Sequence, residues 1–262
     1  MRLLAIGDVC GPFGCEYIRR ALPSLKREKG IDVTIINGEN SADGNGITPY
    51  SAEFLFNCGA DIITGGNHSL RRAEINDMLD NNPFLLRPHN LSEAEYGSGY
   101  CLADFGSFSM AVINLSGVIY LERSAATNPF AAADELIEKA KADCASVIAV
   151  DFHAEATSEK RALGLYLDGK ISAFFGTHTH IQTADEQILE NGTGYITDLG
   201  MTGVKNSVLG VKSDIIINRL KDNDMSKFVF AEGKCFLNGC IFDIDLKTGK
   251  TTHIERVTLN EI

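Results

Sequence analysis

The most regular feature of the chain is a short, mostly apolar run that ends in glycine or polar residues and recurs five times. Continuous apolar runs of this kind are typical of strands that are buried on both faces of a sheet. A half-exposed strand would instead alternate between apolar and polar positions. We therefore predict central strands at residues 3–6, 33–36, 62–64, 147–150 and 171–175.

Helical patterns lie between these runs, and together they predict a layered α/β protein with mixed sheets. The expected helices are 15–29, 51–58, 73–81, 129–142 and 158–168. Pro129 fits a first helical turn, whereas Pro23 is expected to kink or shorten its helix. Residues 100–120 and the pair of segments around the 247–250 turn favour antiparallel strands, and the alternation over 241–246 predicts a half-buried strand.

Length and composition limit the classes of function. The 262 residues contain no linker-like stretch and no repeat of fixed period, so we expect one domain, 1–262. The net charge of −11 argues against tight binding to duplex nucleic acid or to an anionic membrane. A small anionic substrate stays compatible, because bound metal ions can outweigh the global charge.

The location of the protein is expected to be cytoplasmic. No segment approaches the ~20 apolar residues of a membrane span, and the N-terminus lacks the apolar core of a signal peptide. The seven cysteines are scattered and odd in number. They are expected to be buried thiols rather than disulfides or structural zinc ligands.

Residues that can bind a metal stand where each predicted strand ends. They are Asp8, Glu39 with Asn40, Asn67 with His68, His153, and His178 with His180. Sites in open α/β sheets form at the carboxyl ends of strands. Carboxylate oxygen, amide oxygen and imidazole nitrogen suit divalent Mn, Fe or Zn, and the lack of a thiolate disfavours a structural zinc site.

Taken alone, each of these residues has a structural explanation. Asp8 could shape a turn or cap a helix, and asparagines beside glycines are common in loops. The His178-Thr179-His180 pattern is more specific, because alternate positions in an extended segment point the same way. The coincidence favours a site: four of six histidines lie at strand ends, and only His89 and His253 lie in no such context.

The order of these motifs resembles that of the calcineurin-like metallophosphoesterases: Gly7-Asp8, Gly38-Glu39-Asn40, Gly66-Asn67-His68, a separate His153, and Gly176-Thr177-His178-Thr179-His180. The longer strings 151–160, 176–184 and 197–203 look like the YmdB-type branch, a group of bacterial 2′,3′-cyclic-nucleotide phosphodiesterases. The resemblance covers essentially the whole chain. It implies an αββα sandwich, in which two mixed sheets are flanked by helices.

The resemblance also implies two divalent metal ions per chain, with Fe or Mn favoured over Zn. One ion would be held by Asp8, Glu39, Asn40 and His180, and the other by Glu39, Asn67, His153 and His178, with Glu39 bridging. The superfamily usually has a histidine where Cys10 stands, and Asn40 would fill that vacancy. The branch has Thr-Trp-Asp in place of Ser69-Leu70-Arg71 and a small residue in place of His89, departures that concern the pocket wall.

The expected reaction is hydrolysis of a phosphodiester. Two cations ~3.5–4 Å apart can hold a bridging hydroxide and clamp a phosphoryl group for in-line attack. The resemblance leaves His68 outside the ligand set, so we predict it to be the general acid or a donor to the developing charge. Asp151 and Asp198 are candidates for orienting ligand histidines, with a structural role equally open.

The resemblance implies 2′,3′-cyclic nucleotides as substrates, opened to 3′-nucleotides. A base stacked on an aromatic or apolar wall would be recognised with little regard to its identity. His89 and residues 69–71 are the candidates for altering this preference. The expected partner is thus a small phosphodiester, and the chain is a candidate for homo-oligomerisation.

Two other functions remain as alternatives. Glycines 7, 11 and 14 with Asp32 invite comparison with a dinucleotide-binding fingerprint, but their spacing departs from Gly-x-Gly-x-x-Gly and leaves the histidines unexplained. A metal-holding regulatory protein with weak or vestigial activity is the second alternative. His68 beside a full ligand set argues for turnover.

Overall fold

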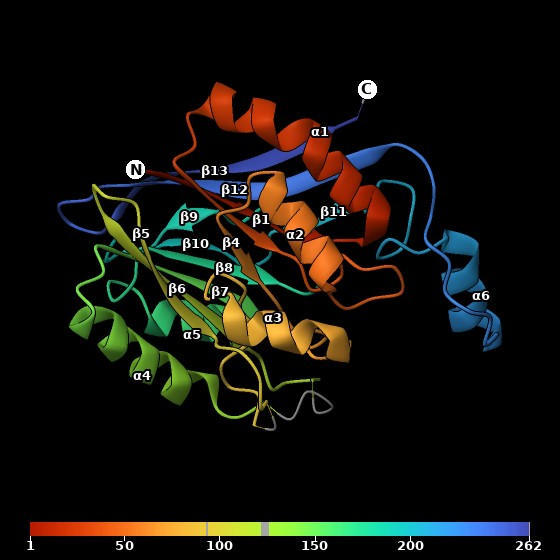
Figure 1. Cartoon of the computed structure of the whole chain (residues 1–262), viewed down its shortest axis with the longest axis horizontal. Helices are drawn as coiled ribbons and strands as arrows, with labels where there is room; N and C mark the ends of the chain where they lie inside the picture. Colours follow the sequence, from red (N-terminus) through yellow and green to blue (C-terminus); the bar gives the residue numbers. More distant parts are fainter. Residues whose placement is uncertain (93, 122–125, 262) are drawn as a thin grey trace.

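Two β-sheets pack face to face between two layers of helices in the computed structural model, which describes residues 1–92, 94–121 and 126–261 (Figure 1). In the first sheet the strand order is β2-β11-β12-β1-β3-β4, with β13 beside β12. Its strands are β1 (Arg2–Ile6), β2 (Asp8–Val9), β3 (Val33–Asn37), β4 (Ile62–Thr64), β11 (Met201–Val204), β12 (Cys235–Ile244) and β13 (Thr251–Asn260). The αββα sandwich is therefore confirmed.

The second sheet has the order β5-β6-β7-β8-β10-β9. Its strands are β5 (Tyr100–Asp104), β6 (Ser109–Ser116), β7 (Val147–His153), β8 (Ala173–Thr177), β9 (Gln187–Ile188) and β10 (Gly194–Ile196). β6, β7, β8 and β10 run parallel, while β5 and β9 pair antiparallel at the edges. The antiparallel pairs predicted at 100–120 and around 247–250 are both present.

Three apolar clusters hold the four layers together. One cluster fills the space between the sheets, with Val33 and Phe175 among its fully or almost fully buried members. The second joins the first sheet to its helices, and the third joins the second sheet to α4 and α5. All five predicted central strands are buried along nearly their whole length, as continuous apolar runs require.

The helices agree with the prediction in place but less well in their ends. They are α1 (Gly11–Lys29), α2 (Pro49–Asn57), the 3₁₀ turn η1 (Ala73–Ile75), α3 (Asn76–Asn81), α4 (Pro129–Ala142), α5 (Thr157–Tyr166) and α6 (Ser213–Asp222). Pro23 does not shorten α1, which continues for six residues beyond it. None of the described helices is long and apolar enough to span a bilayer.

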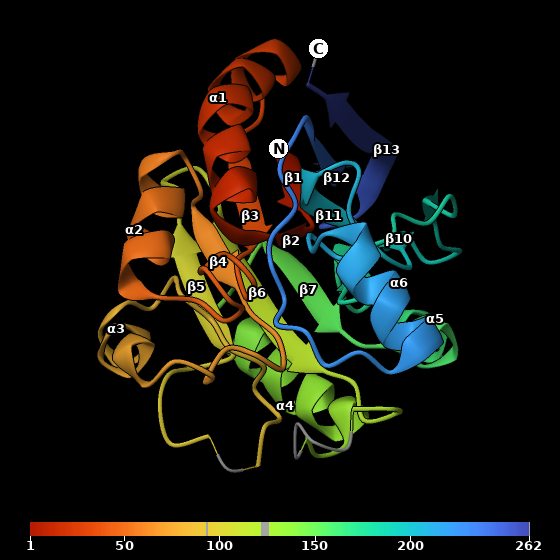
Figure 2. The ribbon, with the colours of Figure 1, turned by 90° about the vertical axis from the view of Figure 1, so that its right-hand side faces the viewer.

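Three further expectations need correction. β12 is not half-buried, because Ile241 packs toward the helices and Phe242 packs between the sheets. β12 is an interior strand, with β1 and β11 on one side and β13 on the other. All seven cysteines are described and are free thiols, but Cys144 is exposed. The pattern also failed to predict α6, which projects from one side of the sandwich and faces the viewer in Figure 2.

Candidate metal centre

The carboxyl ends of β3, β4, β7 and β8 meet β2 on the side of the molecule where α6 lies (Figure 2). Asp8 belongs to β2, and Glu39 with Asn40 and Asn67 with His68 form the turns after β3 and β4. His153 ends β7, while His178 and His180 follow β8. An unbroken chain of contacts joins the seven expected ligands to one another.

One group of donors surrounds the side chain of His153, which is fully buried. Its Nε2 lies 3.0 Å from Asn67 Oδ1, 3.0 Å from His178 Nδ1 and 3.3 Å from Glu39 Oε1. One ligand atom each from Glu39, His153 and His178 lies within 4.8 Å of the others. Gly66 makes this approach possible, since a Cβ there would meet Glu39 Oε2 at 2.2 Å and His153 Nε2 at 2.3 Å.

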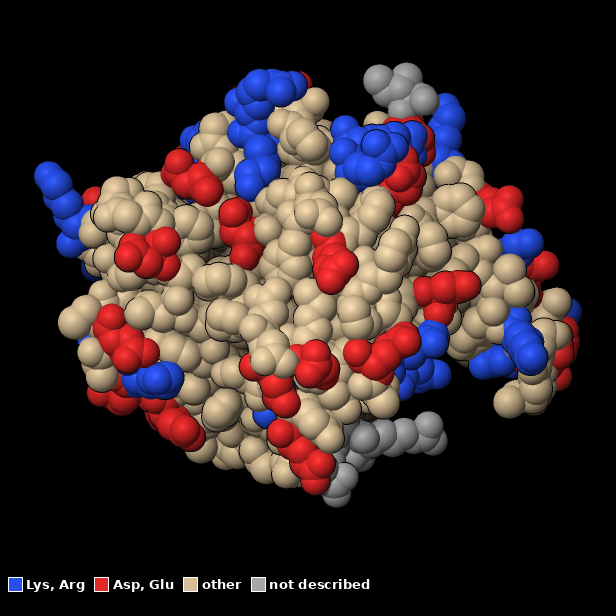
Figure 3. Space-filling view, in the orientation of Figure 1, with Lys and Arg blue, Asp and Glu red and all other residues tan. Residues whose placement is uncertain are grey.

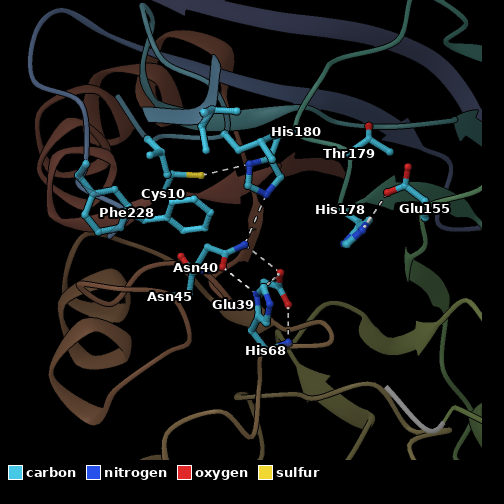
Figure 4. A pocket seen from close by; sticks show the side chains of 14 residues that line it. Cys10, Glu39, Asn40, Asn45, His68, Glu155, His178, Thr179, His180 and Phe228 are labelled. Atoms are coloured by element: carbon cyan, nitrogen blue, oxygen red, sulfur yellow. Dashed lines mark hydrogen bonds and ion pairs between the residues drawn. The ribbon is translucent and has the colours of Figure 1, made fainter. Parts of the chain in front are cut away.

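The second group of donors consists of Asp8, Asn40 and His180 (Figure 4 shows the latter two). His180 Nε2 lies 3.6 Å from Asp8 Oδ1 and 3.4 Å from Asn40 Nδ2, and Asn40 Nδ2 lies 2.8 Å from Glu39 Oε1. Asp8 Oδ1 is buried without a hydrogen-bond partner among the described residues. A buried carboxylate oxygen without a donor is unfavourable, and a cation beside it removes the deficit.

The two histidines after β8 have unusual backbone conformations. His178 has φ of 99° and His180 has φ of 64°, a region that non-glycine residues enter at a cost of order 1–3 kcal/mol. Hydrogen bonds hold this strained loop: the amide of His178 donates to Asp8 Oδ2 at 3.1 Å, and that of Thr179 to Asp198 Oδ2 at 3.2 Å. Strain that the surroundings hold in place in this way is typical of functional sites.

The charges of the site are strongly coupled. Burial alone would lower the pKa of His153, but the carboxylates of Glu39 and Asp8 outweigh it and raise this pKa to about 9. Burial and the neighbouring charge of His153 lower the pKa of His178 to about 3, so this ring is neutral. Burial opposes ionisation of Glu39, yet His153 and His68 hold its pKa well below the ordinary value.

His68 contacts two of the expected ligands, Glu39 and Asn40. Its amide donates to Glu39 Oε2 at 3.0 Å, and its Nδ1 lies 3.1 Å from Asn40 Oδ1. The side chain is partly exposed and lines the same cavity as Glu39 and His180 (Figure 4). The volume of this cavity is about 320 Å³. The side chain of His68 can therefore reach a substrate held at the donor groups.

Neither Asp151 nor Asp198 contacts a ligand histidine directly, which favours the structural role over the orienting role, the two roles that the sequence left open. Asp151 accepts from Asn37, Thr64 and Thr177, and only Thr177 Oγ1 touches His153 Nδ1, at 3.0 Å. Burial raises the pKa of Asp151 to about 6. Asp198 accepts from the backbone of Thr179 and Gly200 and from the buried Lys160, and so fixes the loop rather than a ring.

The residues predicted to shape the pocket wall lie elsewhere. His89 borders a different cavity, together with Asn90 and Glu135, and residues 69–71 do not line the cavity of the site. Ser69 is buried, and its Oγ accepts from the amide of Gly66, so it supports the turn that carries Asn67. Asp32 lies before β3, at the end of the strand away from the site, which removes the basis for a dinucleotide fingerprint.

Sequence reasoning missed two features of the site. Glu155 lines the cavity, and its Oε2 lies 3.0 Å from His178 Nε2 (Figure 4). Its position two residues after His153, at the end of β7, was a signal that could have been used. The second feature is an apolar wall, formed by Leu209, Val211, Ile216, Phe228 and Phe230.

The residues present fit a metal centre. They offer three imidazoles, two carboxylates and two amides at one cluster of strand ends, the donor set that borderline divalent ions prefer. The oxygen of Asp8 has no hydrogen-bond partner that a cation would have to displace, and the ring of His178 is in the neutral form that a cation requires.

Curated proteins similar to this chain are phosphoesterases by name. A 2′,3′-cyclic-nucleotide 2′-phosphodiesterase of Bacillus subtilis is 47% identical over 261 residues, which cover 100% of this chain and 98% of that protein. A putative phosphatase/phosphodiesterase of Mycoplasma pneumoniae is 35% identical over 266 residues, covering 100% of this chain and 94% of that protein.

Solved structures agree with this relationship. A hypothetical protein of Thermus thermophilus superposes with a TM-score of 0.92 at 34% identity and covers 100% of both chains. A novel phosphatase of Mycoplasma pneumoniae gives 0.93 at 34% identity, over 99% of this chain and 93% of that one. The model of the YmdB-like protein family matches residues 4–257, and the chain therefore belongs to this family.

Proposed function

We propose that the protein is a phosphodiesterase that uses two divalent metal ions to hydrolyse 2′,3′-cyclic nucleotides to 3′-nucleotides. The observation that carries the proposal is the buried Asp8 Oδ1, which has no hydrogen-bond partner among the described residues and lies beside the other six metal donors. His68 lines the cavity at these donors. The name of the Bacillus subtilis relative supports the choice of substrate.

The proposed ligands divide into two sets that share Glu39. Asp8, Asn40 and His180 would hold one ion with Glu39, and Asn67, His153 and His178 would hold the other. Bound there, the ions would neutralise phosphate charge and supply a nucleophile at neutral pH. Imidazole and carboxylate donors without thiolate suit Fe, Mn or Zn, and of these we propose Fe or Mn.

The side chain of Asn40 would link the ligand set to His68. Its Nδ2 faces Glu39 and its Oδ1 faces His68 Nδ1. Metal ligation requires Oδ1 on the Glu39 side, which a half-turn of the amide provides. Nδ2 then donates to His68 Nδ1, which makes Nε2 the ring nitrogen that carries a proton. That nitrogen, which has no partner in the described ranges, would donate a hydrogen bond to the leaving oxygen and stabilise the negative charge that develops there.

The cavity and the surface favour a small substrate. About 320 Å³ lies at the lower end of the range for small-molecule sites and suits one mononucleotide. On the face seen in Figure 3, acidic side chains are scattered widely, and many of the basic ones gather along the upper edge above α1. Such a surface repels a long polyanion more than it repels a cyclic phosphodiester of one negative charge.

Substitution of His68 by alanine tests its role as a donor to the leaving oxygen. We expect both metal sites to be retained and turnover to fall by roughly 10²–10³-fold, the usual cost of removing one donor to a developing negative charge. The loss should shrink for diesters with good leaving groups, because less negative charge on the leaving oxygen then needs a donor. His89→Ala is the matched control, since this histidine is also partly buried but lies outside the cavity.

Two measurements would contradict the proposal. Full activity after chelation and removal of metal would exclude the metal-dependent mechanism. Faster hydrolysis of nucleoside monophosphates than of any 2′,3′-cyclic or 3′,5′-cyclic nucleotide would exclude the substrate class, while the metal centre itself would stand.

A further inference from the structure

The segment between β11 and β12 has no role in the chemistry described above, yet it forms one side of the cavity. It carries α6, and none of the ten residues of this helix, all of them described, is buried. The same segment supplies the apolar wall of the cavity, Leu209, Val211, Ile216, Phe228 and Phe230. The helix therefore contributes to a site rather than to the core.

The base of the apolar wall is fixed to the start of α1. Val211 and Phe230 pair as an isolated bridge, and the amide of Ala231 donates to Gly210 O at 2.9 Å. Phe230 packs on Gly11, where a Cβ would meet the ring at 2.8 Å, so only glycine allows this contact. Because Gly11 follows β2 closely, the wall keeps a defined position relative to Asp8.

The outer part of the apolar wall is left exposed. Phe228 is 50% exposed and Leu209 is 52% exposed. Leu209 also has a φ of 54°, an unfavourable conformation for a branched apolar residue. Arg219 of α6 lies 4.1 Å from the centroid of the Phe228 ring, a cation–π contact that holds the ring in place. An aromatic surface is thus kept open toward the cavity.

The opposite part of the cavity carries charged and polar groups. In Figure 4, Phe228 and Asn45 lie to one side of Asn40 and His180, whereas His178 and Glu155 lie to the other. A ligand that fills both parts needs an anionic end for the donor groups and a flat, uncharged end for the wall. The side chains of the apolar wall offer no hydrogen-bond donor or acceptor, so they can contact the face of a ring but cannot read its edge.

We infer that the apolar wall is a nucleobase subsite, on which the base of the substrate stacks against Phe228 and Ile216. The inference rests on the proposed function, because it takes the phosphodiester at the metal centre as the anchor of the same molecule. Stacking on apolar and aromatic groups tolerates every base, since each has a π-face. The apolar wall then selects for the presence of a base and not for its identity.

Two ligand pairs test the nucleobase subsite. In the first, the rate of hydrolysis is measured for adenosine 2′,3′-cyclic phosphate and for methyl riboside 2′,3′-cyclic phosphate, which has no base. In the second, calorimetry on the metal-loaded protein measures the affinity for adenosine 3′-phosphate and for methyl riboside 3′-phosphate. For Phe228→Ala and Ile216→Ala we expect kcat/KM and affinity for the base-containing ligands to fall roughly 5- to 150-fold, the range for one stacked base. The base-free ligands should change less than about twofold. Ile217→Ala is the control, because this neighbour on α6 is exposed and does not line the cavity.

Two outcomes overturn the nucleobase subsite, and a third separates it from the proposed function. Equal losses with and without a base would show that the wall shapes the metal centre instead. An unchanged preference for base-containing ligands, with a change of mass in size-exclusion chromatography, would make the wall a contact between copies of the chain. Failure of the wild type to hydrolyse either cyclic phosphate would refute the proposed function alone, because the calorimetric comparison still decides whether a base is bound.

Discussion

Replacement of Lys160 by methionine should weaken the fold and the metal centre together. Lys160 extends from α5 into the core, where its side chain is fully buried. Its Nζ donates to Asp198 Oδ2 at 2.6 Å and to the carbonyl of Thr177 at 2.8 Å. Asp198 in turn accepts from the amide of Thr179, so this ion pair holds the loop that carries both histidines after β8.

The expected magnitude follows from what the substitution leaves behind. Removing one partner of a buried ion pair costs about 3–5 kcal/mol, because the remaining charge is buried without compensation. The amides of Thr179 and Gly200 still donate to Asp198, which places the loss near the lower limit, at about 3 kcal/mol. For a chain of this size, that loss corresponds to a fall in Tm of roughly 6–12 °C.

The measurement is denaturant and thermal unfolding of metal-free protein, so that metal binding does not add to the stability. Lys141→Met is the control, since Lys141 pairs with Glu138 at 2.8 Å but both side chains are more than half exposed. Such a pair is worth less than about 1 kcal/mol. The double variant Lys160→Met/Asp198→Asn should lose less than the sum of the two single variants. Equal losses for Lys160→Met and Lys141→Met, or a strictly additive double variant, would refute the reasoning.

Two further predictions concern metal binding. Glu155→Gln should weaken binding at the His178 side by roughly 10–100-fold, because the carboxylate at 3.0 Å orients the ring, and calorimetric titration with Mn²⁺ measures the loss; an unchanged affinity would show that Glu155 is a surface residue only. Metal uptake at pH 7.5 should release at least one proton per chain, because the carboxylates of Glu39 and Asp8 raise the pKa of His153 to about 9 and a ligand must be neutral, and ionisation of a metal-bound water would add to this release. The apparent affinity should therefore rise with pH up to about 9, and titrations in buffers of different ionisation enthalpy count the protons; no dependence on the buffer would contradict this.

The sequence predicted the strands and the donor residues because both depend on local patterns. An apolar run bounded by glycine is a property of neighbouring positions, and parallel strands place their ends on the same side of a sheet. The residues that follow those ends were thereby brought together without knowledge of the packing. The metal ions and the role of His68 remain proposals, since they concern chemistry that the fold permits but does not perform by itself.

What the sequence did not predict depends on contacts between distant positions. Asp151 accepts a hydrogen bond from Asn37, 114 residues away, and Asp198 accepts one from Lys160, 38 residues away. The periodicity of a sequence does not indicate such pairs. α6 was missed for a different reason. Its apolar residues are not buried, so they form no pattern of core positions, and the helix owes its place to the cavity that it borders.

The distribution of the ligands between the sheets has a consequence for folding. Asp8, Glu39, Asn40 and Asn67 come from the first sheet, whereas His153, His178 and His180 come from the second. The donors approach one another only when the two sheets have packed, because no single sheet holds a complete set. Metal ions bound across this junction would stabilise the packed state by their full binding free energy, since the unfolded chain offers no preformed site. The strained loop after β8, with two histidines at positive φ, becomes tolerable for the same reason: the sandwich holds it, and a cation bound there would favour the same conformation.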